Sequence, residues 1–308
     1  MNAAKHDILP PRLKRGDTIG IIAPAGPVRD QEQFAAGIRL IKEMGFKVKF
    51  DRDIYRQEGY LAGDDEQRAT ELNTLWADPE VKALIAARGG YGSLRIANRI
   101  NMDLVRSQPK ILIGFSDVTV LLCAVGKEAN LITFHGPTVS TLATSDRQSA
   151  ESLFNTISSP RPPEPIKPER LEIIAPGDAA GPITGGNLTN LCHLTGTPFE
   201  PDWHQAILFL EDIGEAPYRI DRMLTHLAAA GKLTEISGLL LGDFTDCGDK
   251  EIIWRRALEL TGGEIPIWGN FPVGHNVQNL TLPVGLSGEM DSNAGRLQFN
   301  SLCTAESD

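Results

Sequence analysis

The sequence has few cysteines, no long apolar segment and no excess of positive charge. Its apolar runs fall well short of the roughly 18 to 20 residues that a helix needs to cross a bilayer. The segment Met1–Gly16 contains no uninterrupted apolar stretch, so we expect no secretory signal. We also expect reduced thiols and a cytoplasmic location, because the four cysteines are far apart and form no CxxC pair (Cys123, Cys192, Cys247 and Cys303).

The charge balance is acidic. Lysine and arginine number 30 against 40 aspartates and glutamates, which gives a net charge of −10. Nonspecific binding to nucleic acid requires clustered positive charge, so we expect no nucleic-acid partner and no membrane partner. The composition, 41% hydrophobic and 23% charged, is that of a globular protein, and 308 residues favour two domains.

Motifs typical of two large enzyme classes are missing as well. The sequence contains neither a GxxxxGK[ST] phosphate loop nor an HExxH metal pair, and no two histidines have a convincing metal-ligand spacing. The glycine-rich segment Arg88–Gly92 (RGGYG) lacks the third glycine of a dinucleotide-binding turn. It is either a tight turn or a loop whose free N–H groups face a cleft. We therefore expect no cofactor and no metal, and keep a nucleotide-dependent enzyme as a minor alternative.

The first half alternates apolar runs with amphipathic stretches, which predicts βαβ units and a parallel sheet covered by helices. Strands are expected at Thr18–Ala23, Lys47–Phe50, Val81–Ala86, Lys110–Gly114 and Leu131–Phe134. Helices are expected at Gln31–Met44, Asp65–Trp76 and Val118–Ala129.

A proline-rich segment divides the chain. Five prolines among the twelve residues from Ser158 to Glu169 exclude a helix or a central strand there. We interpret residues 158–180 as a linker between an N-terminal α/β domain, 1–157, and a C-terminal domain, 181–308, that is richer in strands. The alternative is a surface loop within one domain.

Three segments contain candidates for catalysis. Ser116 lies in a GFSD turn between an apolar strand and a helix, where its hydroxyl can stand above the carboxyl edge of the sheet. The alternative is that Ser116 caps the helix. Glu211 and Asp212 follow another apolar strand, a position at which α/β folds place working residues, although an acid there can also cap the helix that begins near Pro217.

His275 is the third candidate, because it lies in a glycine-flanked loop. His193 and His226 are expected to pack on helices, and the others lie near the terminus, in a turn and in a loop (His6, His135 and His204). Spacing alone does not bring Ser116 and His275 together. The residues by themselves therefore support only the hypothesis of a serine hydrolase.

Taken together, these segments resemble the LD-carboxypeptidase family of serine peptidases, the murein tetrapeptide carboxypeptidases. The resemblance covers nearly the whole chain, and the combination of its motifs is specific. The matching segments are Arg88–Gly92, Gly114–Asp117, Gly185–Leu188 with Gly196–Pro198, Glu211–Leu224 and Gly274–Gly285.

The resemblance implies an N-terminal parallel-sheet domain similar to class I glutamine amidotransferases and a β-rich C-terminal domain. It implies that Ser116 is the nucleophile, Glu211 the acid and His275 the base. It also implies an oxyanion hole made by the backbone N–H groups of Gly90 and Asp117. Members are commonly homodimers.

The function that the resemblance implies is hydrolysis of the L,D bond between meso-diaminopimelate, or L-lysine, and the terminal D-alanine of peptidoglycan tetrapeptides, during murein recycling. One alternative is a microcin-immunity-type peptidase acting on peptidyl-nucleotide antibiotics, for which Trp203 is a candidate stacking residue. An alternative of another class is a peptide-binding protein without catalysis.

Overall fold

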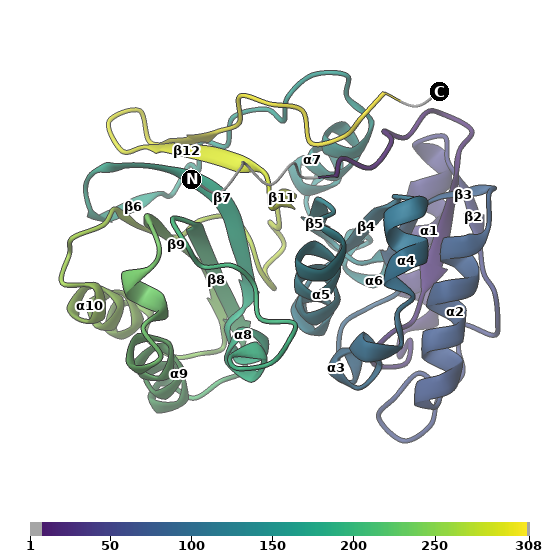
Figure 1. Ribbon diagram of the computed structural model, residues 1–308, viewed down its shortest axis with the longest axis horizontal. Helices are drawn as coiled ribbons and strands as arrows, with labels where there is room; N and C mark the ends of the chain where they lie inside the picture. Colours follow the sequence, from purple (N-terminus) through teal and green to yellow (C-terminus); the bar gives the residue numbers. More distant parts are fainter. Residues whose placement is uncertain (1–7, 307–308) are drawn as a thin grey trace.

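The computed structural model describes residues 8–306, which form two α/β parts that lie side by side, each with its own sheet (Figure 1). The N-terminal sheet has six strands, and β1 to β5 run parallel. Their spatial order is β11 (Leu282–Val284), β5 (Thr133–His135), β4 (Ile111–Gly114), β3 (Val81–Ala86), β1 (Thr18–Ile22) and β2 (Lys47–Lys49). The predicted parallel sheet is confirmed.

Helices flank this sheet, and its central strands are buried along nearly their whole length, which explains their continuous apolar runs. Side-chain caps at Asp30, Asp64 and Asp146 start three of the helices. The helices are α1 (Gln31–Glu43), α2 (Asp65–Ala77), α3 (Ser93–Ile96), α4 (Met102–Ser107), α5 (Thr119–Ala129), α6 (Val139–Leu142) and α7 (Arg147–Ser158), with 3-10 turns η1 (Ala97–Arg99) and η2 (Ser116–Val118).

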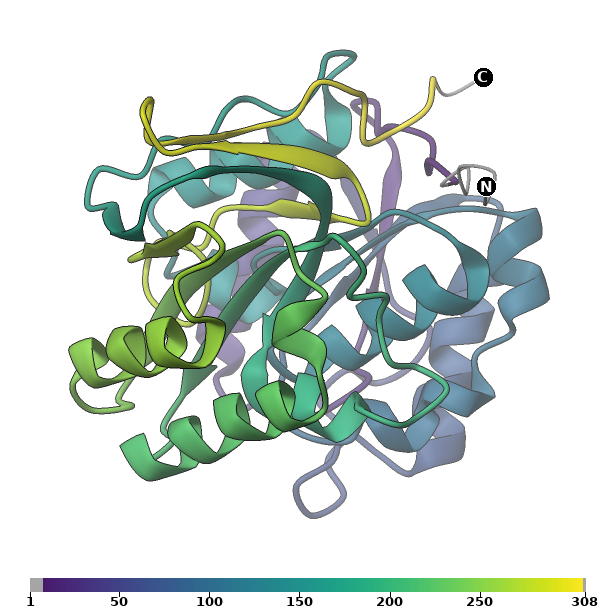
Figure 2. The same cartoon turned by 60° about the vertical axis from the view of Figure 1, so that its left-hand side comes forward.

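The C-terminal sheet has seven strands, of which β7 to β10 run parallel. Figure 2 shows α9 and α10 next to each other along one face of it. The order is β13 (Arg296–Gln298), β12 (Ser287–Asp291), β7 (Asp178–Asn187), β8 (Ile207–Ile213), β9 (Gly238–Thr245), β10 (Ile267–Gly269) and β6 (Glu172–Ala175). Its helices are α8 (Leu188–Leu194), α9 (Pro217–Ala229) and α10 (Lys250–Thr261), with a 3-10 turn η3 (Lys232–Thr234). This part is therefore mixed α/β, rather than mainly β.

The predicted linker, 158–180, is longer than the irregular segment in the structure. Ser158 is the last residue of α7, and β6 begins at Glu172. Strand structure resumes there because the proline-rich run ends at Pro168 and residues of 172–175 pair with β10. Between these points the chain is extended and is held by the backbone hydrogen bond from Ile166 N–H to the carbonyl of Leu297, 2.8 Å.

The two parts share their interior. Strand β11 comes from the C-terminal half but pairs antiparallel with β5, so that Leu282 lies opposite His135 in the N-terminal sheet. One apolar cluster joins Val120 of α5 to Leu188 of α8, and a second joins Phe134 of β5 to Phe209 of β8. The side chains of both halves thus form common cores. Within residues 8–306, none of the helices is long and apolar enough to cross a membrane.

Candidate active site

Ser116 stands at the carboxyl end of β4 in a strained backbone conformation. Its φ is 62°, a left-handed value that costs a residue with a side chain about 1–3 kcal/mol. The turn is tight, because a Cβ on Gly114 would lie 2.6 Å from Cγ1 of Val118. The 3-10 turn η2 begins at Ser116 itself and has no side-chain cap, and α5 begins after Val118 without one. The helix-cap interpretation of Ser116 is therefore wrong.

The glycine-rich segment after β3 packs against this serine. A Cβ on Gly89 would lie 2.8 Å from Ser116 Cβ and 2.9 Å from its Oγ, so no larger residue fits. Gly90 has a φ of 126°, and a Cβ there would meet the backbone nitrogen of Gly26 at 2.9 Å. Gly26 N–H in turn donates to the Gly89 carbonyl at 3.1 Å. The segment therefore approaches Ser116 at a distance that only glycine permits, and Gly89 and Gly90 line the adjoining cavity.

Glu211 is fully buried near the carboxyl end of β8, next to a break in the register between β8 and β9. Such irregularities redirect a side chain. Here the Glu211 carboxylate Oε2 lies 2.6 Å from Nδ1 of His275. The cap of α9 is Ala216, so the helix-cap interpretation of Glu211 is wrong.

His275 is brought to Glu211 by the loop that follows β10. The loop crosses the end of β9, where Asp243 N–H donates to the Val273 carbonyl at 2.8 Å. Gly274 permits the approach, because a Cβ there would lie 3.2 Å from Glu211 Oε2. The ring of Phe115 packs on the imidazole with centroids 4.8 Å apart.

Glu211 and His275 shift each other's pKa. Burial alone would lower the pKa of His275, but the Glu211 carboxylate outweighs it, so the pKa of His275 is raised above its usual 6.5. Burial raises the pKa of Glu211, and His275 opposes that shift. When Glu211 is ionised its carboxylate only accepts hydrogen bonds, so Nδ1–H donates to it and Nε2 is left as the basic nitrogen of the neutral ring.

Ser116 and His275 line one cavity of about 260 Å³, together with Gly89 and Gly90. Glu211 reaches this cavity through its bond to His275. Asp117 is buried beside it and accepts a hydrogen bond from Ser93 N–H at 2.8 Å. Ser116, Gly90 and His275 therefore line one cavity, and Glu211 and Asp117 lie directly behind its lining.

The role of Asp212 and the presence of Asn190 at the site were not found from the sequence. Asp212, the second acid of the pair, turns away from His275 and accepts from Asn187 Nδ2 at 2.9 Å and Thr189 N–H at 3.0 Å, which fixes the start of α8. Asn190, also on α8, donates to the Ser116 carbonyl at 3.4 Å. The GGNL segment, which contains Asn187, was the sequence signal for these contacts, but Asp212 and Ser116 lie far from it along the chain.

The other histidines do not join the site. His193 and His226 are exposed, so the expectation that they pack is wrong; they lie on the outer sides of α8 and α9. His204 is exposed as well, and His6 lies outside the described residues. His135 is fully buried at the end of β5, and burial lowers its pKa to about 3.

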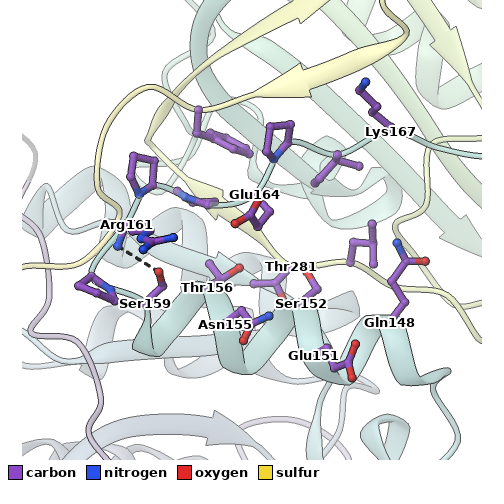
Figure 3. Close-up of a pocket in the computed structure, with 17 residues that line it drawn as sticks. Gln148, Glu151, Ser152, Asn155, Thr156, Ser159, Arg161, Glu164, Lys167 and Thr281 are labelled. Atoms are coloured by element: carbon purple, nitrogen blue, oxygen red, sulfur yellow. Dashed lines mark hydrogen bonds between the residues drawn. The ribbon is translucent and has the colours of Figure 1, made fainter.

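The described residues, 8–306, offer no evident metal centre. They contain no group of three or more histidine, cysteine, aspartate or glutamate side chains placed to hold a metal. A larger cavity of about 560 Å³ lies between α7 and the proline-rich segment (Figure 3), but neither Ser116 nor His275 lines it. In that view Gln148 and Asn155 extend from α7, while Arg161 and Lys167 come from the opposite segment.

Comparison with known proteins agrees with this architecture. Residues 19–136 match the family model described as the LD-carboxypeptidase N-terminal domain, and residues 180–290 match the LD-carboxypeptidase C-terminal domain. The chain belongs to the LD-carboxypeptidase family. The site described above spans both matched regions, since Ser116 lies in the first and Glu211 and His275 in the second.

Three relatives illustrate the range of the LD-carboxypeptidase family. A probable murein peptide carboxypeptidase of Bacillus subtilis is 38% identical and covers 92% of this chain and 91% of its own. The crystal structure of muramoyltetrapeptide carboxypeptidase from Oxalobacter formigenes has a TM-score of 0.80 at 32% identity, covering 91% and 97% of the two chains. The microcin C7 self-immunity protein MccF of Escherichia coli is 26% identical over 91% of this chain and 93% of its own.

Proposed function

We propose that this protein is a serine carboxypeptidase that removes the terminal D-alanine from peptidoglycan tetrapeptides by cleaving its bond to meso-diaminopimelate or L-lysine. The observation that carries the proposal is the 2.6 Å contact between Glu211 and His275, whose imidazole shares a cavity with Ser116. A nucleophile, a base and a buried acid that orients the base are the parts of a serine hydrolase. The murein and muramoyltetrapeptide carboxypeptidases among its relatives support the choice of substrate.

In the proposed mechanism, Nε2 of His275 accepts the hydroxyl proton of Ser116 as Oγ bonds to the carbonyl carbon. Glu211 holds the Nδ1–H tautomer and stabilises the imidazolium. The same proton then passes to the amine of D-alanine, which leaves as the C–N bond breaks. Water next attacks the ester and loses a proton to His275, which returns it to Ser116 Oγ as the ester C–O bond breaks and the tripeptide leaves with a new carboxylate.

The negative oxygen formed in each attack requires hydrogen-bond donors, and we assign this role to the backbone N–H groups of Gly90 and Asp117. Gly90 lines the cavity. A Cβ on Gly89 would lie 3.6 Å from the Asp117 amide nitrogen, so this amide is close to the glycine loop. Loss of one such donor reduces kcat by about 100- to 1000-fold in comparable enzymes.

The test is mass spectrometry of L-Ala-D-Glu-meso-diaminopimelate-D-Ala incubated with the protein, where we expect tripeptide and free D-alanine. We expect the Ser116→Ala variant to keep its melting temperature and to lose D-alanine release and reaction with a fluorophosphonate probe. Turnover by that variant at the wild-type rate would refute the role of Ser116. A wild-type protein that binds the peptide without cleaving it would favour the non-catalytic alternative.

A peptidase acting on a peptidyl-nucleotide antibiotic is the second candidate, supported by the similarity to MccF. The residue considered for base stacking, Trp203, does not favour it. The side chain of Trp203 is 2% exposed, and its Nε1–H donates to Glu200 at 2.8 Å, so it is part of the interior. Cleavage of aspartyl sulfamoyl adenosine in preference to the tetrapeptide would establish this alternative.

The cytoplasmic location and the homodimer stay predictions, and size-exclusion chromatography with light scattering tests the homodimer.

A further inference from the structure

An arginine without an acidic partner lies beside the proposed nucleophile. Arg88 directly precedes Gly89, is half-buried and lines the cavity that contains Ser116 and His275. Its Nη1 donates to the Pro27 carbonyl at 3.0 Å. Among residues 8–306, no aspartate or glutamate forms an ion pair with it. A desolvated guanidinium left with one neutral acceptor retains donors for an anion.

A second cation reinforces the positive potential. Arg29 is exposed and lines the same cavity. Burial lowers the pKa of Arg88, and the charge of Arg29 lowers it further, which means that the two guanidinium groups are close enough to repel each other. The single acid of the cavity, Asp30, caps α1 by accepting from Gln33 N–H at 2.9 Å. Two arginines and one engaged carboxylate thus line the cavity, while the two acids behind its lining have partners of their own, Asp117 with Ser93 N–H and Glu211 with His275.

We propose that Arg88, assisted by Arg29, binds the C-terminal carboxylate of the peptide and so makes the enzyme an exopeptidase. The inference rests on the function proposed above. The planar fork of an arginine matches a carboxylate in a two-bond arrangement. Gly89 packs against Ser116, and its neighbour Arg88 lines the same cavity, where the carboxylate of a single departing residue would lie next to the attacked carbonyl.

The substrate carries other carboxylates, on its D-glutamate and on meso-diaminopimelate, and the shared chemistry is an anion facing two arginines. The terminal group is favoured because it alone lies on the leaving residue beyond the attacked carbonyl. Two matched substrates distinguish these sources. One ends in D-alaninamide, and the other has L-lysine in place of meso-diaminopimelate.

The experiment compares kcat/KM for these peptides in the wild type, Arg88→Met, Arg88→Lys and Arg29→Ala. We expect the wild type to prefer the free acid over the amide by about 10- to 100-fold, the value of a charge-assisted pair. Arg88→Met should lose that preference, because kcat/KM should fall for the free-acid peptide and stay the same for the D-alaninamide peptide. Arg88→Lys should restore part of the preference. Arg29→Ala should reduce the preference by about 3- to 10-fold. Arg39→Ala, an exposed change on α1 outside the cavity, is the matched control and should change nothing.

An equal loss for acid and amide in Arg88→Met would overturn the inference, because it would indicate a structural role through Pro27. Loss of the Arg88 effect with the L-lysine peptide would also overturn it, in favour of the diaminopimelate carboxylate. If Arg88→Met does not fold, Arg88→Lys and Arg29→Ala decide, since unchanged acid-to-amide ratios in both would refute the proposal. A wild type that cleaves neither peptide and does not react with a fluorophosphonate refutes the proposed function instead.

Discussion

At the scale of single residues, the position of Ser116 depends on the absence of a side chain at Gly89. We expect Gly89→Ala to lower kcat/KM for the tetrapeptide by about 100-fold, because its Cβ would meet Ser116 Cβ at 2.8 Å and displace the hydroxyl. Steady-state kinetics measures this. Gly126→Ala in α5 is the control, since its Cβ would meet its nearest atom, the Leu131 carbonyl oxygen, at an ordinary 3.8 Å. It should keep full activity and gain about 0.5–1 kcal/mol of stability. Equal activity of the two variants would contradict the expectation.

The ionisation of His275 predicts the pH dependence of the reaction. The base must be neutral to accept the serine proton, so kcat/KM should fall as the pH drops through the His275 pKa, which lies above 6.5 because of Glu211. In Glu211→Gln the largest opposing charge is gone and only Asp212 and Asp243 still oppose the effect of burial, so the pKa of His275 should fall and the acidic limb should move to lower pH. The plateau should also drop by about 100-fold or more, because the imidazole tautomer is no longer held. A pH–rate profile tests both, and a flat wild-type rate down to about pH 4 would exclude His275 as the base.

At the scale of elements, Asp212 joins the end of β8 to the start of α8. Asp212→Ala would leave the Asn187 amide and the Thr189 N–H without their acceptor in a buried place, so we expect a loss of about 2–4 kcal/mol in the free energy of unfolding. Urea denaturation measures it. The control is Asp221→Ala on α9, whose half-exposed carboxylate pairs with Arg256. That change should cost about 1 kcal/mol or less. A similar cost at both positions would show that the buried hydrogen bonds of Asp212 stabilise the protein no more than an exposed ion pair does.

Some helices and strands could be predicted from the sequence, and others could not. The apolar patterns predicted β3 with its observed bounds and α1 to within one residue, because a continuous apolar run and a 3.6-residue spacing are properties of neighbouring residues. The linker prediction extended to residue 180 because nothing local distinguishes β6 from irregular chain until β10 is beside it. Strand β11 was missed for the same reason: its three residues, Leu-Pro-Val, form a strand only against β5.

At the scale of the whole molecule, the two halves are coupled by β11 and by apolar cores that both halves build. We expect one thermal transition in calorimetry, with equal calorimetric and van't Hoff enthalpies. We also expect the fragment 1–157 to be unfolded alone, because the edge of β5 and the shared core would face water, and to gain structure when mixed with 158–308. Two separate transitions, or a folded isolated fragment, would instead establish the predicted domains as independent units.

The sequence by itself determined the α/β character, the strand and helix periods, and which residues have the chemistry of a nucleophile, an acid and a base. It could not distinguish a capping serine from one on a strained turn, nor assign the two acids Glu211 and Asp212 to different tasks. Those decisions came from tertiary structure. His275 and Glu211 are 64 residues apart along the chain, and only the packing of the loop after β10 over the ends of β8 and β9 brings their side chains to hydrogen-bonding distance. Local patterns record what each segment buries, whereas a site depends on which buried faces meet.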